Sequence, residues 1–163
     1  MYQDKKLHFI SMDVPFPPNY GGVIDVFYKL KAFHQLGVEI YLHLFGFNET
    51  ESDVLRKYAK EVYFYPIHQK PYYIFQKYPI SVKSRDSKLL YERIKSLKAP
   101  IFFESLKTTF ILNKYNLEGC SKYLRLHNIE QNYFSGLAVS EKNLVKKALF
   151  YIEAKKYIQY ENI

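Results

Sequence analysis

The chain has 163 residues, and its 24 Lys and Arg against 16 Asp and Glu give a formal net charge of +8. Hydrophobic residues make up 48% and charged residues 25%, a balance that excludes a disordered tail or a fibrous repeat and favours one packed domain. Cys120 is the single cysteine and no apolar run is long enough for a signal peptide or a membrane span, so we expect a cytoplasmic protein without disulfides or zinc thiolates.

The N-terminal part of the chain predicts a strand, a helix and a second strand. Leu7–Met12 is a short, mostly apolar run that ends in a Pro-rich loop. From Val23 to Leu36 apolar residues recur at steps of three and four, and Gly37 stands at the C-cap position of the predicted helix. Val38–Phe45 follows as the second strand. This order indicates a βαβ unit.

The alternation of helices and strands continues along the chain. The further predicted strands are Val62–Tyr65, Ile101–Phe103 and Tyr123–His127; the further helices are Ser52–Lys60, Ser87–Leu97, a turn near Thr108–Asn113 and two that close the chain. The last helix, Glu141–Tyr160, carries an apolar stripe formed by Leu144, Val145, Ala148, Leu149 and Ile152. The sequence predicts neither a helix nor a strand for the aromatic-rich segment Tyr72–Tyr78.

This pattern predicts an α/β fold, a Rossmann-like, doubly wound and mainly parallel sheet with helices on both faces, because parallel neighbours need helical crossovers. Ligands of such sheets bind at the carboxyl ends of the strands. The chain stops after a helix without a closing strand, so we expect it to be part of a longer protein.

The loop before the first helix is the first candidate site. Gly21 and Gly22 begin that helix, where backbone N–H groups lack partners and the macrodipole is positive, so an anion can approach closely. The loop contains neither the dinucleotide-binding glycine pattern nor a P-loop. The alternative explanation is a backbone turn that needs glycine at positive φ.

A second candidate lies after the strand Tyr123–His127. His127, Asn128 and Glu130 form a polar cluster at the expected ligand edge, where an imidazole can bind a sugar hydroxyl or a phosphate. The alternative is that His127 or Asn128 is a helix cap. Glu104 ends another predicted strand and is a further candidate. His8 and His43 alternate within strands and are interpreted as structural, and no histidine spacing indicates a metal site.

Five segments carry a resemblance to a known family. They are Pro15–Gly22 (PFPPNYGG), Phe33–Ile40 (FHQLGVEI), Ile101–Leu106 (IFFESL), Leu124–Glu130 (LRLHNIE) and Ile152–Glu161 (IEAKKYIQYE). In this order they resemble the N-terminal domain of a bacterial glycosyltransferase of the GT-B fold and the retaining family-4 type. The resemblance covers nearly the whole chain.

The resemblance implies one Rossmann-like, acceptor-side domain over residues 1–163, with the C-terminal nucleotide-sugar domain absent and the isolated chain inactive. The implied reaction transfers a hexose with retention from a nucleotide-diphosphate sugar to a glycan or lipid-linked acceptor, with no cofactor and no metal required. Gly21 and Gly22 would lie by the donor diphosphate and the acceptor, and His127 would contact the transferred sugar. The other substrate-binding candidates are Asn19, Glu104, Arg125, Asn128 and Glu130.

The charge is uneven along the chain. Residues 1–80 hold 9 basic and 8 acidic groups, net +1, whereas residues 81–163 hold 15 and 8, net +7. With the aromatic side chains of Tyr72–Tyr78, this basic half indicates a peripheral contact with the inner face of the membrane. The alternatives are a solvated face and a non-catalytic basic module that binds nucleic acid or another polyanion; no specific nucleic-acid motif is present.

Overall fold

The computed structural model describes residues 5–46 and 52–161. Its five strands are β1 (Lys6–Ser11), β2 (Glu39–Phe45), β3 (Glu61–Tyr65), β4 (Ile101–Phe103) and β5 (Lys122–Leu124). They form one sheet in the order β3-β2-β1-β4-β5, and every neighbouring pair is parallel. The predicted α/β Rossmann-like fold is therefore confirmed.

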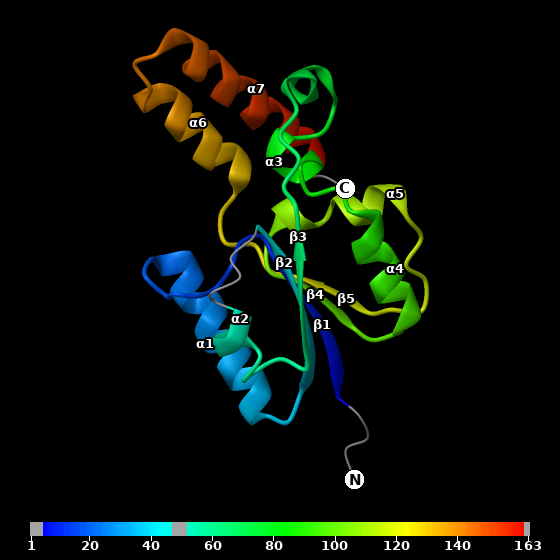
Figure 1. Cartoon of the computed structure of the whole chain (residues 1–163). Helices are drawn as coiled ribbons and strands as arrows, with labels where there is room; N and C mark the ends of the chain where they lie inside the picture. Colours follow the sequence, from blue (N-terminus) through cyan, green and yellow to red (C-terminus); the bar gives the residue numbers. More distant parts are fainter. Residues whose placement is uncertain (1–4, 47–51, 162–163) are drawn as a thin grey trace.

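Helices cover both faces of the sheet (Figure 1). The α-helices are α1 (Gly21–Gln35), α2 (Ser52–Leu55), α3 (Ile80–Lys83), α4 (Lys88–Ser96), α5 (Phe110–Lys114), α6 (Glu130–Ser140) and α7 (Leu144–Tyr160), and the 3-10 turns are η2 (Pro71–Phe75) and η3 (Leu106–Thr108). Helices α1 and α2 lie on one face, and α4 and α5 on the other. The sheet is thus the middle layer of three.

Strand β1 is buried on both faces because it lies at the centre of the sheet. Successive side chains of a strand point to opposite faces. Phe9 packs with Leu30 of α1, whereas Ile10 packs with Ile94 of α4, and all four are 0% exposed. Burying each such side chain contributes about 1.5–3 kcal/mol. This two-sided burial explains why the strand is an almost unbroken apolar run.

Two predicted elements are shorter in the structure. The helix predicted over Ser52–Lys60 ends at Leu55, and Lys60 N–H instead donates to Ile40 C=O, which carries the chain to the sheet. The strand predicted over Tyr123–His127 is β5, which ends at Leu124 because its partner β4 offers only three residues for pairing. All three β5 side chains are exposed, as expected for an edge strand.

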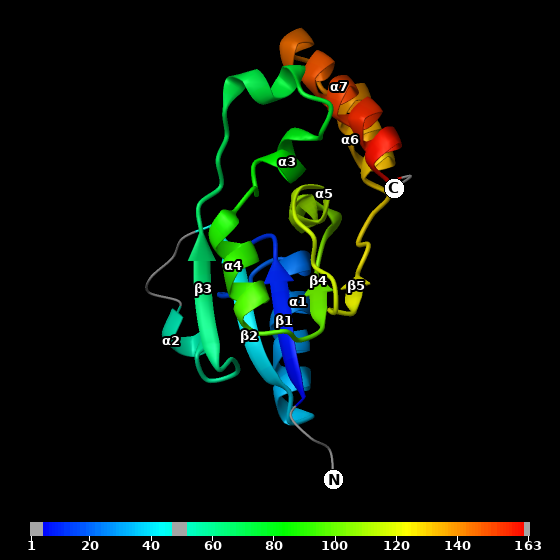
Figure 2. The same cartoon turned by 90° about the vertical axis from the view of Figure 1, so that its right-hand side faces the viewer.

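The apolar stripe of the last helix does not form a core face. Helix α7 begins at Leu144, after the Asn143 side chain accepts from two backbone N–H groups of the first turn. Leu144 and Val145 are 80% and 70% exposed, and the buried residues lie in the second half: Glu153, Ala154, Lys156, Tyr157 and Tyr160. Helices α6 and α7 form a hairpin that stands off the sheet, so only its base meets the body (Figures 1 and 2).

A buried polar chain crosses the face of the sheet that α4 covers. Arg93 donates to the Tyr65 hydroxyl at 3.1 Å, and Tyr65 lies 2.8 Å from His43 Nδ1. His43 Nε2 is 2.9 Å from His8 Nδ1, and His8 Nε2 is 2.7 Å from Leu97 C=O. Because a carbonyl only accepts, His8 Nε2 carries a proton. Burial lowers the pKa of both histidines and so favours neutral imidazoles, and with neutral rings every proton in the chain points from Arg93 toward Leu97. The interpretation of His8 and His43 as structural agrees with this burial.

We predict that the free energy of unfolding falls as the pH is lowered from about 7 to about 5. Burial lowers the pKa of His8, and of His43 more strongly, below the usual 6.5. Below 6.5 the unfolded chain therefore binds protons that the folded chain does not, and each histidine adds a slope of up to about 1.4 kcal/mol per pH unit. Urea unfolding at several pH values measures this slope.

The control for this slope is a matched pair of variants. His43→Leu removes one of the two buried titrating groups and should flatten the pH dependence, whatever its effect on absolute stability. His68→Asn changes an exposed histidine and should keep the slope of the unaltered chain. An equal slope in both variants would contradict the assignment.

Candidate functional site

The sheet order places a crevice at the carboxyl ends of β1 and β4. The chain runs from β1 outward to β3 and then returns to the other side of β1 as β4, so the order reverses between these two strands. Such a switch point is where open α/β sheets bind ligands. A small pocket lies there, lined from β1 and its following loop, from the first turns of α1, from Glu104 and from His127. Its cavity of about 10 Å³ fits one water-sized group.

Gly21 and Gly22 form the first turn of α1 beside this pocket. Neither has positive φ; the glycines with positive φ are Gly37, Gly46 and Gly119. A Cβ at Gly21 or Gly22 would meet no atom within 4 Å. The alternative explanation by a glycine-requiring turn is therefore wrong, and packing does not require these glycines either. What their missing side chains leave is open space above the helix N-terminus.

Asp13 and Tyr20 close one side of the pocket. The Tyr20 hydroxyl donates to Asp13 Oδ2 at 2.7 Å, and Val14 N–H donates to Asp13 Oδ1 at 2.9 Å. Burial, together with the neighbouring Asp13 carboxylate, raises the pKa of Tyr20 to about 12. The phenol thus stays protonated and presents a hydroxyl oxygen, held in place by the carboxylate, next to Gly22.

Glu104 is the centre of a buried ion cluster on the opposite side of the pocket. Its side chain is 1% exposed, and Oε1 accepts from Lys29 Nζ at 2.6 Å and from Arg125 at 2.8 Å. Lys29 and Arg125 both also pair with Asp25. The cluster ties α1, the end of β4 and the segment after β5 together. Two cations beside one carboxylate offset the cost of burying its charge.

His127 lies against the same carboxylate. Its Nε2 is 3.1 Å from Glu104 Oε1, a distance suited to an ion pair, but the ring is not oriented for a hydrogen bond. Glu104 Oε2 also has no hydrogen-bond partner among the described residues. Ile129 is the N-cap of α6, with no side-chain cap, so the alternative that His127 or Asn128 caps this helix is wrong. Glu104 Oε2 and His127 Nε2 therefore remain available for further hydrogen bonds at the pocket.

A metal ion is one way to use such groups. Ligand atoms of Asp25, Glu104 and His127 lie within 4.8 Å of one another. Lys29 and Arg125, however, already pair with one oxygen of each carboxylate, Asp25 Oδ2 and Glu104 Oε1. The donor set therefore fits an internal salt-bridge cluster better than a cation site.

The remaining predicted residues lie apart from the pocket lining. Asn19 and Asn128 are exposed. Glu130 is buried in the first turn of α6, where its Oε2 is 3.3 Å from Lys107 Nζ. Arg125 does not line the pocket, but it pairs with Glu104, which does. Sequence reasoning missed Asp25 and Lys29, although an i, i+4 acid–base pair one turn after a glycine pair is a signal that could have found them.

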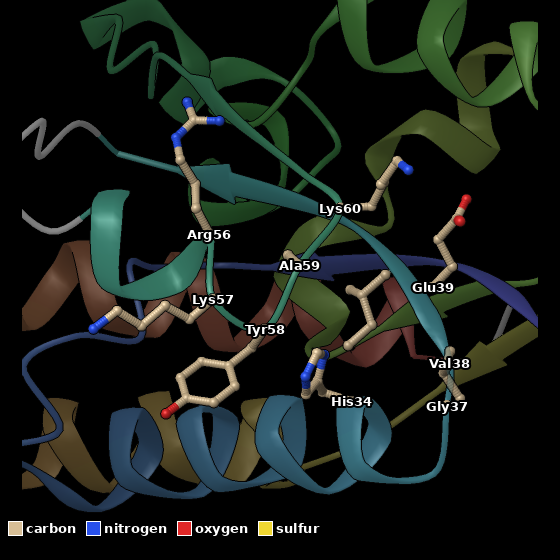
Figure 3. A pocket seen from close by; sticks show the side chains of 10 residues that line it. His34, Gly37, Val38, Glu39, Arg56, Lys57, Tyr58, Ala59 and Lys60 are labelled. Atoms are coloured by element: carbon tan, nitrogen blue, oxygen red, sulfur yellow. The ribbon is translucent and has the colours of Figure 1, made fainter.

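A larger hollow lies at the opposite end of the sheet. It measures about 340 Å³ and is formed by the end of α1, the start of β2 and the segment before β3 (Figure 3). The side chains of Arg56, Lys57 and Lys60 extend from it in different directions, so these three cationic groups do not converge there. Volume alone does not mark the site, because ligands of parallel sheets bind at the carboxyl edge.

The chain is similar to a protein of Klebsiella pneumoniae. The chain is 27% identical over 155 residues to the "Uncharacterized 44.6 kDa protein in cps region" of Klebsiella pneumoniae, with 91% of this chain aligned. It spans about 40% of that protein's length. No protein-family profile and no solved structure matches the chain.

We predict that Glu104→Leu lowers the free energy of unfolding by about 3 kcal/mol, because it leaves two partly buried cations short of a partner. Asp25→Asn is the control: that carboxylate is 41% exposed, so its loss should cost no more than about 1 kcal/mol. Urea unfolding at neutral pH measures both. Equal effects of the two substitutions would contradict Glu104 as the centre of the cluster.

Proposed function

We propose that this chain is the acceptor-side domain of a GT-B glycosyltransferase, which moves a hexose with retention from a nucleotide-diphosphate sugar to a glycan or lipid-linked acceptor. The observation that carries the proposal is the convergence of Gly22, Glu104 and His127 on one pocket at the switch point. These three residues come from segments far apart in sequence, and each lies in a segment that resembles the family.

The relative supports the same context. It is named for a cps region, a capsule gene region, which favours a role in polysaccharide synthesis. It is also about two and a half times as long as this chain's match, which leaves room in that protein for a second domain. A nucleotide-sugar domain of that kind is what the proposed reaction requires, because transfer takes place between two domains.

The pocket offers two chemically different neighbourhoods. The open space over Gly22 lies at the α1 N-terminus, where the first N–H groups of a helix have no intrahelical acceptor. Such groups suit a diphosphate and would stabilise the charge that develops on it as it leaves. The pocket lining also carries the Asp13 and Glu104 carboxylates, which accept hydrogen bonds from hydroxyls and are less suited to a phosphate. We assign the diphosphate to the first neighbourhood and a sugar hydroxyl to the second.

Gly22→Val is expected to lower transfer by at least about tenfold, because the side chain would occupy the space reserved for the ligand. Gly22→Ala should raise the free energy of unfolding by about 0.5–1 kcal/mol while also lowering activity. The assay is release of nucleoside diphosphate from UDP- and GDP-hexoses by the natural protein, with capsular polysaccharide as acceptor.

Gly136 supplies the matched control for these variants. It also lies inside a helix, without positive φ and with no atom within 4 Å of a built Cβ. Gly136→Ala should therefore stabilise the fold similarly and leave transfer unchanged. Full turnover of Gly22→Val would reject the ligand role of the glycine pair.

His127→Ala is expected to lower turnover about tenfold, since it removes one polar contact to the transferred sugar, and to leave nucleotide affinity nearly unchanged. Steady-state kinetics and nucleotide titration of the same natural protein measure the two quantities. His34→Ala changes an exposed histidine at the far end of α1 and serves as control. Equal loss of nucleotide binding and turnover would assign His127 to the nucleotide instead.

A further inference from the structure

The far end of the α6–α7 hairpin exposes apolar side chains that nothing in the described structure covers. Val139, Leu144 and Val145 are 71%, 80% and 70% exposed. They lie on the last turn of α6 and the first turn of α7, at the connection that points away from the sheet (Figure 1). We call these residues, together with Lys142 and Lys146 beside them, the hairpin tip.

A second exposed apolar element lies at the same end of the molecule. Phe75 and Tyr72 of η2 are 89% and 51% exposed. The segment is tied to α7, because Lys156 Nζ donates to Tyr73 C=O at 3.1 Å. Figures 1 and 2 both place η2 and the hairpin tip at the end toward which the strands point. Tyr73 itself is buried, so only part of the aromatic segment is available at the surface.

Both elements carry positive charge. The exposed lysines beside the apolar side chains are Lys70, Lys77, Lys142 and Lys146, and Lys147 is half-buried next to them. Glu141 is the one carboxylate within residues 139–147, and its Oε1 accepts from Asn143 N–H within the connection. Aliphatic and aromatic side chains are thus interleaved with lysines that form no salt bridge among residues 5–46 and 52–161.

We propose that the hairpin tip and η2 dock on the surface of an anionic lipid bilayer. Lysine is depleted in the cores of protein interfaces, whereas lysine with aliphatic and aromatic side chains is the composition of elements that lie in the lipid headgroup region. Each lysine near an anionic leaflet is attracted to it, and the apolar side chains enter the headgroup boundary. Among the described residues, no helix has both the length and the apolarity needed to cross a bilayer.

This docking would orient the sheet. The strands point toward the hairpin tip, so their carboxyl ends, with the pocket at Glu104 and His127, face the lipid side of the molecule. An acceptor held in the membrane by a lipid would then lie at the same end of the molecule as the pocket. The docking itself does not depend on the transfer reaction and is measured without it.

The test is flotation of this chain with vesicles of phosphatidylcholine alone or with about one-third phosphatidylglycerol. Binding is expected only to the anionic vesicles and should weaken with salt. The double variant Leu144→Ser, Val145→Ser should lower the bound fraction at least about fivefold, and Lys142→Gln with Lys146→Gln should lower it similarly. These side chains are exposed, so circular dichroism should show an unchanged fold.

Leu36→Ser with Lys57→Gln is the control pair, since both side chains are exposed at the opposite end of the sheet, and it should bind as the unaltered chain does. His127→Ala and Gly22→Val should also bind normally, which separates this inference from the proposed function. Undiminished binding by the Leu144 and Val145 variant would overturn the proposal. So would binding to a single-stranded oligonucleotide in place of vesicles, or a dimer in ultracentrifugation that the same variant dissolves.

Discussion

The parallel pairing of β1 with β2 on one side and β4 on the other is the constraint on which the rest of the structure depends. A central parallel strand must be buried on both faces, so helices have to cover both, and the chain has to reverse its direction of winding after β3. That reversal opens the crevice at the carboxyl ends of β1 and β4. The position of the candidate site thus follows from the sheet order before any side chain is considered.

The crevice is completed by buried charge rather than by apolar packing. Glu104 is almost fully buried at the end of β4, and it is tolerable there because Lys29 of α1 and Arg125 after β5 approach the same oxygen. Such a cluster adds less to stability than its contacts imply, since desolvation offsets most of the attraction. Its physical consequence is geometric: it holds three segments, and with them His127, in one arrangement around the pocket.

The α6–α7 hairpin is buried less completely than the sheet and the helices that cover it. Its base is fixed by Tyr157 and Tyr160, which pack with Phe110, and by Glu153, which accepts from Ile80 N–H. In the part of the chain that the structure describes, its outer half has no such contacts with the body, and its apolar stripe is in contact with solvent. An amphipathic pattern therefore reports that a face is apolar, but it does not report what covers that face. In α7 the buried face contains both polar and apolar residues, whereas the apolar stripe is exposed to solvent.

The sequence by itself determined the local elements: the apolar run of β1, the three- and four-residue spacing of α1 and the glycine that ends it all depend on residues close together in the chain. It also placed Gly22, Glu104 and His127 at the ends of elements that meet at one edge of the sheet. Only the tertiary structure decided that Asp25 and Lys29 join Glu104, that Glu130 turns away to Lys107, and that the α7 stripe stays exposed. Those outcomes depend on which segments pack together across long sequence separations. A single sequence does not show which of these distant segments lie close together in the fold.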